Sequence, residues 1–143
     1  MNIDWDLLVD KAMHGREFAY VPYSHFKVGS SVLLKDGTII YGCNVENAAY
    51  PNGTCSERNT LQKMISEGYK KEDVVAFAIV GQAKRPISPC GMCRQVMSEL
   101  MPLDTPVVLS NLEKEYIFTT VDKLLPFVIC RNLCLNRRLF LSK

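Results

Sequence analysis

Five apolar residues near the start of the chain recur at helical spacing: Trp5, Leu8, Val9, Ala12 and Met13. Positions i, i+3, i+4, i+7 and i+8 fall on one side of an α-helix. The pattern therefore predicts an amphipathic packing helix that continues past Gly15 towards Tyr20. Val21 and Pro22 end it, because proline cannot continue a helix.

The pattern then changes to short apolar runs, which predict strands. Residues 28–34 and 38–44 flank Asp36-Gly37, a pair that favours a tight turn between two antiparallel strands. Residues 74–80 are continuously apolar, as expected of a central strand that is covered on both faces.

The last third of the chain adds two shorter strands and a short helix, at residues 106–110, 116–120 and 121–125. Strands that alternate with helices predict the α/β class, with helices on both faces of a mixed sheet. The expected fold is a three-layer α/β/α sandwich around a mixed sheet of about five strands.

Between these strands, one predicted helix begins beside a cysteine. Thr54 is a good N-cap, which makes Cys55 the first helical residue and places Glu57 in the first turn. The expected buried face and the expected end of this helix are Leu61, Met64 and Ile65, followed by Gly68.

A second predicted helix also begins beside cysteines. Ser88 provides a capping hydroxyl and Pro89 suits the first helical position, so Cys90 and Cys93 are expected at i and i+3 on one face. The residues expected to point inward from this helix are Val96, Met97, Leu100 and Met101.

The two helix starts together supply three thiols and one carboxylate. The positive end of each helix dipole lowers thiol pKa values and favours thiolates. Three cysteine ligands, Cys55, Cys90 and Cys93, leave a tetrahedral zinc ion with one open position, which is typical of a catalytic site. Glu57 would move protons for the water activated there, and Arg58 is the nearest candidate to offset the negative charge of the thiolates.

Structural roles would also explain these residues. Glu57 suits a capping box with Thr54, since Thr-x-x-Glu is a common helix start. Arg58 suits a solvated helix surface. The Cys90–Cys93 pair suits a redox site, or a structural zinc site that it completes with the Cys130–Cys134 pair.

Composition and charge narrow the class of protein. The chain has 143 residues, of which 48% are hydrophobic and 22% charged, so we expect one globular domain over residues 1–143. The formal net charge is +2, but four basic residues and no acidic ones fall in the last fourteen positions. The remainder is therefore slightly acidic, and we expect no nucleic-acid partner.

The chain also lacks the signals of secretion or membrane insertion. Its first residues have no basic segment followed by an apolar one, and its apolar runs are too short to cross a bilayer. We therefore expect a cytoplasmic protein without a membrane partner. In such a compartment the six cysteines are expected as metal ligands and buried thiols, not as disulfides.

The cysteine motifs and the segments around them resemble the cytidine deaminases, specifically the small form that acts on free nucleosides as a homotetramer. The Cys-x-Glu and Pro-Cys-x-x-Cys pair is the zinc deaminase signature. The resemblance runs from about residue 20 to residue 126. Its segments are residues 22–29, 44–51, 55–58, 88–96 and 124–126. From about residue 127 to residue 143 the chain departs from the family pattern.

The resemblance implies a function and a set of roles. Cys55, Cys90 and Cys93 would hold one Zn²⁺ per chain, and Glu57 would carry protons in the hydrolysis of cytidine or deoxycytidine to uridine or deoxyuridine and ammonia, a step of pyrimidine salvage. Asn44 and Glu46 would hold ribose hydroxyls and Phe26 would stack on the pyrimidine, while Asn47, Ala48 and Tyr50 would complete a pocket that is shared between subunits. The other functions that fit are deamination of a cytosine-bearing antibiotic or of polynucleotide cytosine, and a non-enzymatic zinc module.

Overall fold

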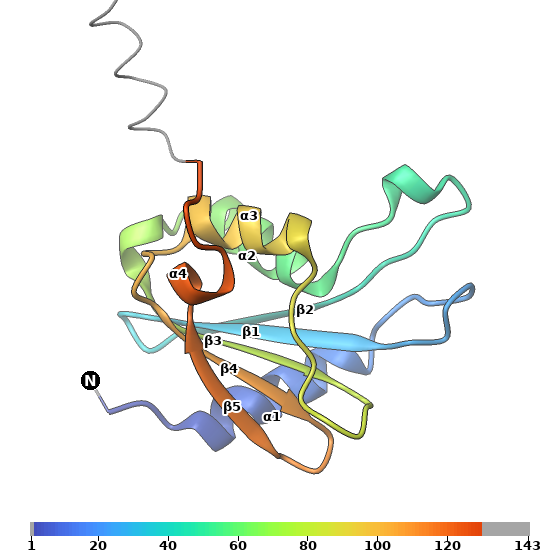
Figure 1. The fold of residues 1–143 in the computed structure, drawn as a ribbon, viewed down its shortest axis with the longest axis horizontal. Helices are drawn as coiled ribbons and strands as arrows, with labels where there is room; N and C mark the ends of the chain where they lie inside the picture. Colours follow the sequence, from blue (N-terminus) through green and yellow to red (C-terminus); the bar gives the residue numbers. More distant parts are fainter. Residues whose placement is uncertain (1, 130–143) are drawn as a thin grey trace, which may run out of the picture.

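In the computed structural model, which describes residues 2–129, five strands form one mixed sheet in the order β2-β1-β3-β4-β5 (Figure 1). The strands β3 and β4 pair in parallel, and every other neighbouring pair is antiparallel. Their bounds are β1 Val28–Leu34, β2 Ile39–Cys43, β3 Val74–Gly81, β4 Pro106–Asn111 and β5 Tyr116–Thr120. The predicted hairpin and the predicted central strand are both confirmed.

The helices cover both faces of this sheet (Figure 1). Helix α1 lies alone on one face and packs on β1, β2 and β3. Three helices cover the other face: α2, α3 and α4. Their bounds are α1 Trp5–Arg16, α2 Ser56–Ser66, α3 Gly91–Leu100 and α4 Val121–Leu124, with short 3-10 turns at Tyr50–Asn52 and Lys71–Asp73. The predicted three-layer α/β/α sandwich is confirmed.

Alternate residues of β3 enter two separate hydrophobic cores. Phe77 and Ile79 pack with α2, α3 and α4, whereas Ala76, Ala78 and Val80 pack with α1. The side chains on the α1 face are small, so this helix lies close to the sheet. At Gly29 an added Cβ would fall 1.9 Å from the carbonyl oxygen of Ala12. The continuous apolar run in β3 therefore reflects burial on both faces.

The predicted extension of the first helix towards Tyr20 is wrong, since α1 ends at Arg16. Tyr20 instead pairs as an extended residue with the segment after β2. Its backbone nitrogen donates to the carbonyl oxygen of Asn44 at 3.0 Å, and its carbonyl oxygen accepts from the nitrogen of Glu46 at 2.8 Å. This pairing fixes the loop at residues 20–26 against the loop at residues 44–54.

The buried face of α2 also differs from the prediction at one residue. Leu61 and Met64 are buried as expected, but Ile65 is 43% exposed. The other buried positions are Ser56, Glu57 and Thr60. Glu57 and Thr60 complete an i, i+3, i+4, i+7 stripe with Leu61 and Met64, and this stripe excludes residue 65. A polar pair thus occupies the part of the stripe nearest the start of α2, where the candidate chemistry lies.

The predicted end of α2 and the predicted inward face of α3 are confirmed. Gly68 has a φ of +94° just beyond α2, which suits the left-handed residue that commonly ends a helix. In α3, Met97 and Met101 are buried, and Val96 and Leu100 pack against the same core.

Within residues 2–129, none of the helices combines the length and the apolar character needed to cross a membrane.

Candidate metal centre and adjoining pockets

Helix α2 begins one residue later than predicted. Its N-cap is Cys55, with φ −68° and ψ 155°, and its first helical residue is Ser56. Thr54 cannot cap it because its backbone forms an antiparallel bridge with Val45, with N···O distances of 2.9 and 3.0 Å. The capping-box explanation of Glu57 is therefore wrong, and the side chains of Cys55 and Glu57 are left for another role.

Helix α3 begins two residues later than predicted, because its N-cap is Cys90 and not Ser88. The i, i+3 relation between Cys90 and Cys93 survives this shift, since one residue is the N-cap and the other the third helical residue. Cys55 and Cys90 therefore occupy equivalent positions, each at the electropositive start of a helix.

The three predicted ligands meet in space. The sulfur atoms of Cys55, Cys90 and Cys93 all lie within 4.8 Å of one another. The Sγ–Sγ distance is 3.8 Å from Cys55 to Cys90 and 3.4 Å from Cys90 to Cys93. Tetrahedral zinc with Zn–S bonds of about 2.3 Å separates its sulfur ligands by about 3.8 Å. The three sulfurs therefore fit zinc with little rearrangement, whereas Cys130 and Cys134, the other proposed pair, lie outside the described residues.

The electrostatics of the three sulfurs also favour a cation. Hydrogen bonds from Cys93 and Cys90, together with the nearby guanidinium of Arg58, lower the pKa of Cys55 to about 6. The pKa of Cys93 is raised, first by its hydrogen bond to Cys55 and then by burial and by the charge of Glu57. A thiolate at Cys55 thus opposes a second one at Cys93, so a divalent cation is needed to hold all three as thiolates.

Glu57 is a buried acid beside these sulfurs. Its side chain is only 4% exposed. Burial, and to a smaller extent the charge of Cys55, raises its pKa to about 7. A carboxyl group with a pKa near neutrality can both accept and donate a proton, which is what a general acid/base needs.

The acid and two of the ligands line a cavity of about 340 Å³. A cavity of this size can hold a small organic ligand. Phe26 and Ile87 contribute apolar surface to it, and Gly81 lets these two side chains approach, since an added Cβ there would fall 2.6 Å from Ile87. The full lining is Phe26, Val28, Asn44, Cys55, Ser56, Glu57, Ile87, Ser88 and Cys90. An aromatic face, a carboxyl group and two of the three sulfurs thus share one space.

Asn44 reaches this cavity but already has partners in the backbone. Its Oδ1 accepts from the nitrogen of Val28 at 2.9 Å, and its Nδ2 donates to the carbonyl oxygen of Phe26 at 2.9 Å. The side chain therefore fixes the segment that carries Phe26. Oδ1 can still accept one more hydrogen bond, and Nδ2 can still donate one more.

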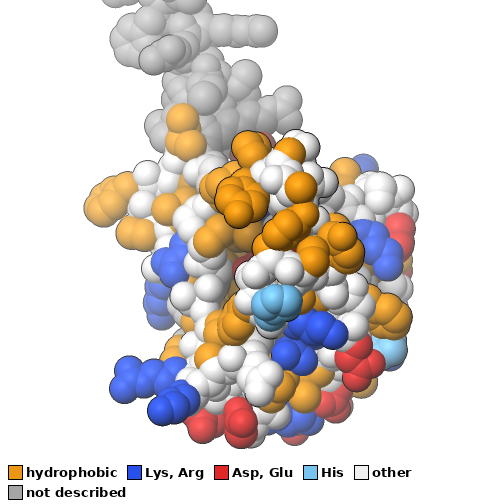
Figure 2. Space-filling view, turned by 90° about the vertical axis from the view of Figure 1, so that its right-hand side faces the viewer, with side chains coloured by type: hydrophobic (Ala, Val, Ile, Leu, Met, Phe, Trp, Pro, Cys, Tyr) orange, Lys and Arg blue, Asp and Glu red, His pale blue; other side chains and the backbone are white. Residues whose placement is uncertain are grey.

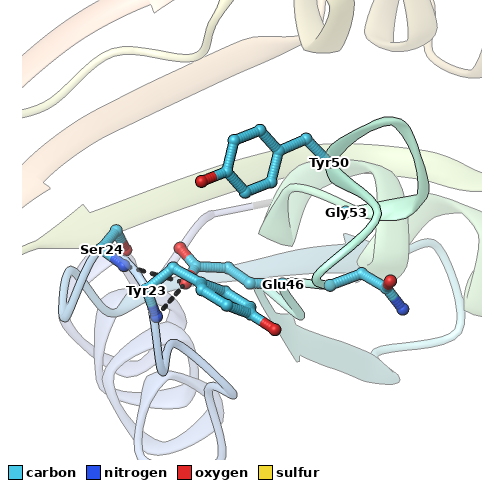
Figure 3. Close-up of a pocket in the computed structure, with 6 residues that line it drawn as sticks. Tyr23, Ser24, Glu46, Tyr50 and Gly53 are labelled. Carbon is cyan, nitrogen blue, oxygen red and sulfur yellow. Dashed lines mark hydrogen bonds between the residues drawn. The ribbon is translucent and has the colours of Figure 1, made fainter.

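Glu46 lies in a second cavity of about 380 Å³, which Figure 3 shows with Tyr23 and Tyr50 beside it. One oxygen of Glu46 accepts from the backbone nitrogens of Ser24 and Tyr23, at 3.0 and 3.1 Å (Figure 3). Hydrogen bonds to Ser24 and Tyr23 lower the pKa of Glu46, so its other oxygen is an ionised acceptor in a fixed position.

The predicted substrate-binding residues are therefore divided between two cavities. Phe26 and Asn44 line the one beside Glu57, while Glu46, Asn47 and Tyr50 line the other. Among the described residues, Ala48 is exposed and lines neither cavity.

Sequence reasoning missed the role of Arg94. Its guanidinium donates from Nε to the carbonyl oxygen of Pro89 at 2.9 Å, and from Nη1 to that of Leu124 at 2.8 Å. It also lies 3.3 Å from the hydroxyl of Ser88. Arg94 thus fastens the start of α3 to the end of α4. The sequence signal for this role was the position of Arg94 directly after Cys93. Because an arginine on a helix is usually solvated, that signal did not indicate a structural role.

Comparisons with known proteins agree with this geometry. A family model for the cytidine and deoxycytidylate deaminase zinc-binding region matches residues 4–109. A cytidine deaminase from Halalkalibacterium halodurans is 52% identical over 124 residues, which is 87% of this chain and 92% of that protein. The structure of a cytidine deaminase from Burkholderia pseudomallei has a TM-score of 0.86 and 42% identity, covering 89% of this chain and 100% of the other. A blasticidin-S deaminase from Bacillus cereus is 28% identical over 87% of this chain and 91% of its own.

Proposed function

This chain belongs to the cytidine deaminase family, and on that basis we propose that Cys55, Cys90 and Cys93 hold one zinc ion beside Glu57, which carries the protons of cytidine deamination. The chain is a zinc-dependent hydrolytic deaminase of cytidine or deoxycytidine. One observation carries the assignment of roles: three sulfurs lie at zinc-like spacing, and two of them line a cavity together with a buried carboxyl group.

The proposed mechanism assigns the proton transfers to Glu57. Zn²⁺ held by Cys55, Cys90 and Cys93 would supply a Lewis acid that makes water a good nucleophile. Glu57 accepts a proton from the attacking water and delivers it to the ring nitrogen N3, as the water oxygen bonds to C4. Glu57 then passes the remaining proton of that oxygen to the exocyclic nitrogen. The C4–N bond breaks, ammonia leaves, and C4 keeps its oxygen as the carbonyl of uridine.

The residues of the two cavities together support a nucleoside as the substrate. The ring of Phe26 offers an aromatic face for a flat pyrimidine. The remaining hydrogen-bonding sites of Asn44 and the free oxygen of Glu46 suit ribose hydroxyls. We assign these three residues to the base and the sugar, with Asn47, Ala48 and Tyr50 completing the pocket.

A homotetramer would close this pocket. Figure 2 shows hydrophobic side chains gathered on the face that carries the loops at residues 20–26 and 44–54. Within the described part of the chain, the large exposed apolar residues on these loops are Tyr20, Tyr23, Phe26, Val45 and Tyr50. Exposed clusters of this kind mark association surfaces. We expect light scattering to give the mass of four chains, and a monomer at micromolar concentration would contradict the assignment.

The activity is tested by the loss of the ultraviolet absorbance of cytidine with purified protein, before and after chelation. We expect turnover that stops on metal removal and returns with Zn²⁺. Cys55→Ser should lose zinc, while Cys43→Ser, which changes a half-buried cysteine outside the cluster, should keep it. Zinc that is lost in Cys130→Ser and kept in Cys55→Ser would indicate a structural site instead.

A further inference from the structure

Three fully buried hydroxyl groups connect β1 to the first turns of α2, directly behind the metal-binding end of that helix. They belong to Ser30, Ser56 and Thr60, each 0% exposed. The Oγ of Ser30 lies 2.7 Å from the Oγ of Ser56 and 2.7 Å from the Oγ1 of Thr60. One strand residue therefore bonds to two helix residues that are one turn apart.

The protons of these hydroxyls can be assigned in one direction along the chain of contacts. Ser56 donates to the carbonyl oxygen of Gly42 at 3.1 Å, so it accepts from Ser30. Ser30 then accepts from Thr60, whose alternative acceptor is the carbonyl oxygen of Ser30 at 3.4 Å. Each hydroxyl donates one hydrogen bond, and the last bond in the series is accepted by the carbonyl oxygen of Gly42 in β2. Such chains polarise one another in a low-dielectric interior.

The backbone of β2 is shaped to fit these contacts. At Gly42 an added Cβ would fall 2.6 Å from the Oγ1 of Thr60 and 3.1 Å from its backbone nitrogen, so only glycine allows this approach. The neighbouring helix residue Asn59 donates from Nδ2 to the carbonyl oxygen of Cys43 at 2.7 Å. Helix α2 is thus held to both β1 and β2 by directional bonds.

The position of Ser56 gives these bonds their significance. It lies between the N-cap ligand Cys55 and the acid Glu57, so any shift of its backbone moves both. Apolar packing is non-directional and tolerates small shifts, whereas a fully satisfied hydroxyl network specifies one arrangement. A misplacement of about 1 Å at a reacting group can cost about a hundredfold in rate.

We propose that Ser30, Ser56 and Thr60 are positioning residues that set the distance between the Glu57 carboxyl group and the metal centre. The proposal rests on the function proposed above. Ser30 and Thr60 do not line the cavity beside Glu57, and the hydroxyl of Ser56 bonds to the sheet. They act by fixing the start of α2, so their removal should lower kcat more than it changes KM or zinc content.

The neighbouring Ser31 provides a matched control. It is also 0% exposed and is the next residue of β1, but its hydroxyl donates to the carbonyl oxygen of Leu8 in α1 at 2.6 Å. Ser30→Ala and Ser31→Ala therefore remove the same atom from the same strand. One change loosens the helix that carries Cys55 and Glu57, and the other loosens the helix on the opposite face.

The experiment measures kcat, KM, zinc content and Tm for both variants. We expect Tm to fall in both. In Ser30→Ala, kcat should fall about tenfold or more because Glu57 is misplaced, with one zinc per chain and KM within about twofold, as expected when an interaction specific to the transition state is lost. Ser31→Ala should keep the kcat of the wild type. Equal kcat values in the two variants would overturn the proposal.

A spectroscopic measurement tests the same proposal without activity. With Co²⁺ in place of zinc, the visible and thiolate charge-transfer bands should shift in Ser30→Ala and not in Ser31→Ala. Unchanged bands together with an unchanged kcat would reject the positioning role, while a wild-type protein that binds metal but does not deaminate cytidine would reject the proposed function. If Ser30→Ala does not fold, Thr60→Val and Thr60→Ser replace it, and only the variant that retains a hydroxyl should keep the wild-type kcat.

Discussion

The two helix starts that form the metal centre are built differently. At the start of α2, Ser56 and Glu57 are buried, and a chain of hydroxyls joins the helix to the sheet. At the start of α3, Cys90 and Met92 are exposed, and the guanidinium of Arg94 fastens the helix to neighbouring backbone. Both helices place a cysteine at the N-cap, yet only α2 adds a buried acid.

This difference separates two tasks. In the proposed mechanism, helix α2 controls the geometry of proton transfer, which depends on a buried carboxyl group in a fixed place. In the proposed mechanism, helix α3 supplies two sulfur ligands, of which Cys90 is exposed and lines the cavity, while Cys93 is buried. Apart from the ligand Cys55 and its neighbour Arg58, substitutions on α2 should therefore affect kcat, and substitutions on α3 should affect metal affinity. The predictions below test this contrast in order of decreasing effect.

The largest effect is expected from Glu57→Gln. The amide keeps the size of the side chain but cannot move protons, so kcat should fall by about a thousandfold or more. Zinc content should remain one per chain. Steady-state kinetics and metal analysis provide the measurement, with Glu67→Gln at the exposed end of α2 as the control. Ordinary turnover in Glu57→Gln would remove Glu57 from the mechanism.

Cys93→Ser should have the largest effect on metal binding. Loss of a direct ligand should weaken zinc binding by more than about a hundredfold, since loss of outer partners alone costs about 10- to 100-fold. Competition with a chromogenic chelator measures the affinity, and Cys43→Ser serves as the control. Zinc binding as tight as in the wild type would exclude Cys93 as a ligand.

A smaller effect on affinity is expected from Arg94→Ala. Without the guanidinium, the start of α3 loses its bonds to Pro89 and Leu124, and zinc affinity should fall about tenfold. At saturating zinc, kcat should stay within about threefold, because Glu57 is on the other helix. Exposed Arg85 provides the control Arg85→Ala. A large loss of kcat with unchanged affinity would reverse the division of tasks.

The smallest effect is expected from Arg58→Ala. The guanidinium helps to lower the pKa of Cys55, so its removal should raise that pKa. Zinc competes with protons for the sulfur, and its binding should therefore weaken at acidic pH and recover as the pH rises. A pH series of zinc titrations measures this, with Lys63→Ala as the control, since Lys63 lies over the ring of Tyr41. An unchanged pH profile would show that Arg58 does not balance the charge of the site.

The sequence predicted that Cys55, Cys90 and Cys93 would meet, and the spacing within each of their two motifs depends only on local helix geometry. Cys90 and Cys93 remain three residues apart wherever α3 begins. The two-residue error in the predicted N-cap therefore did not change their expected position on one face of the helix. Thr54 failed as a cap because its backbone pairs with Val45, a contact that the pattern of residues around Thr54 does not encode.

The features that escaped prediction depend on contacts between distant segments. Ser30 and Ser31 are adjacent serines in β1, yet Ser30 faces α2 and Ser31 faces α1. Only the topology shows which of the two supports the site. The bond from Arg94 to Leu124 spans thirty residues. The separation of Glu46 from Asn44 reflects the conformation of a loop, which its composition of turn residues leaves undetermined.

A zinc titration of metal-free protein, with the rate of cytidine loss followed by ultraviolet absorbance, tests the central claim most directly. The rate should rise in proportion to added zinc and reach a plateau at one ion per chain, whereas Glu57→Gln should bind the same single ion with almost no turnover. A rate that does not depend on zinc, or a Glu57→Gln protein as active as the wild type, would contradict the claim.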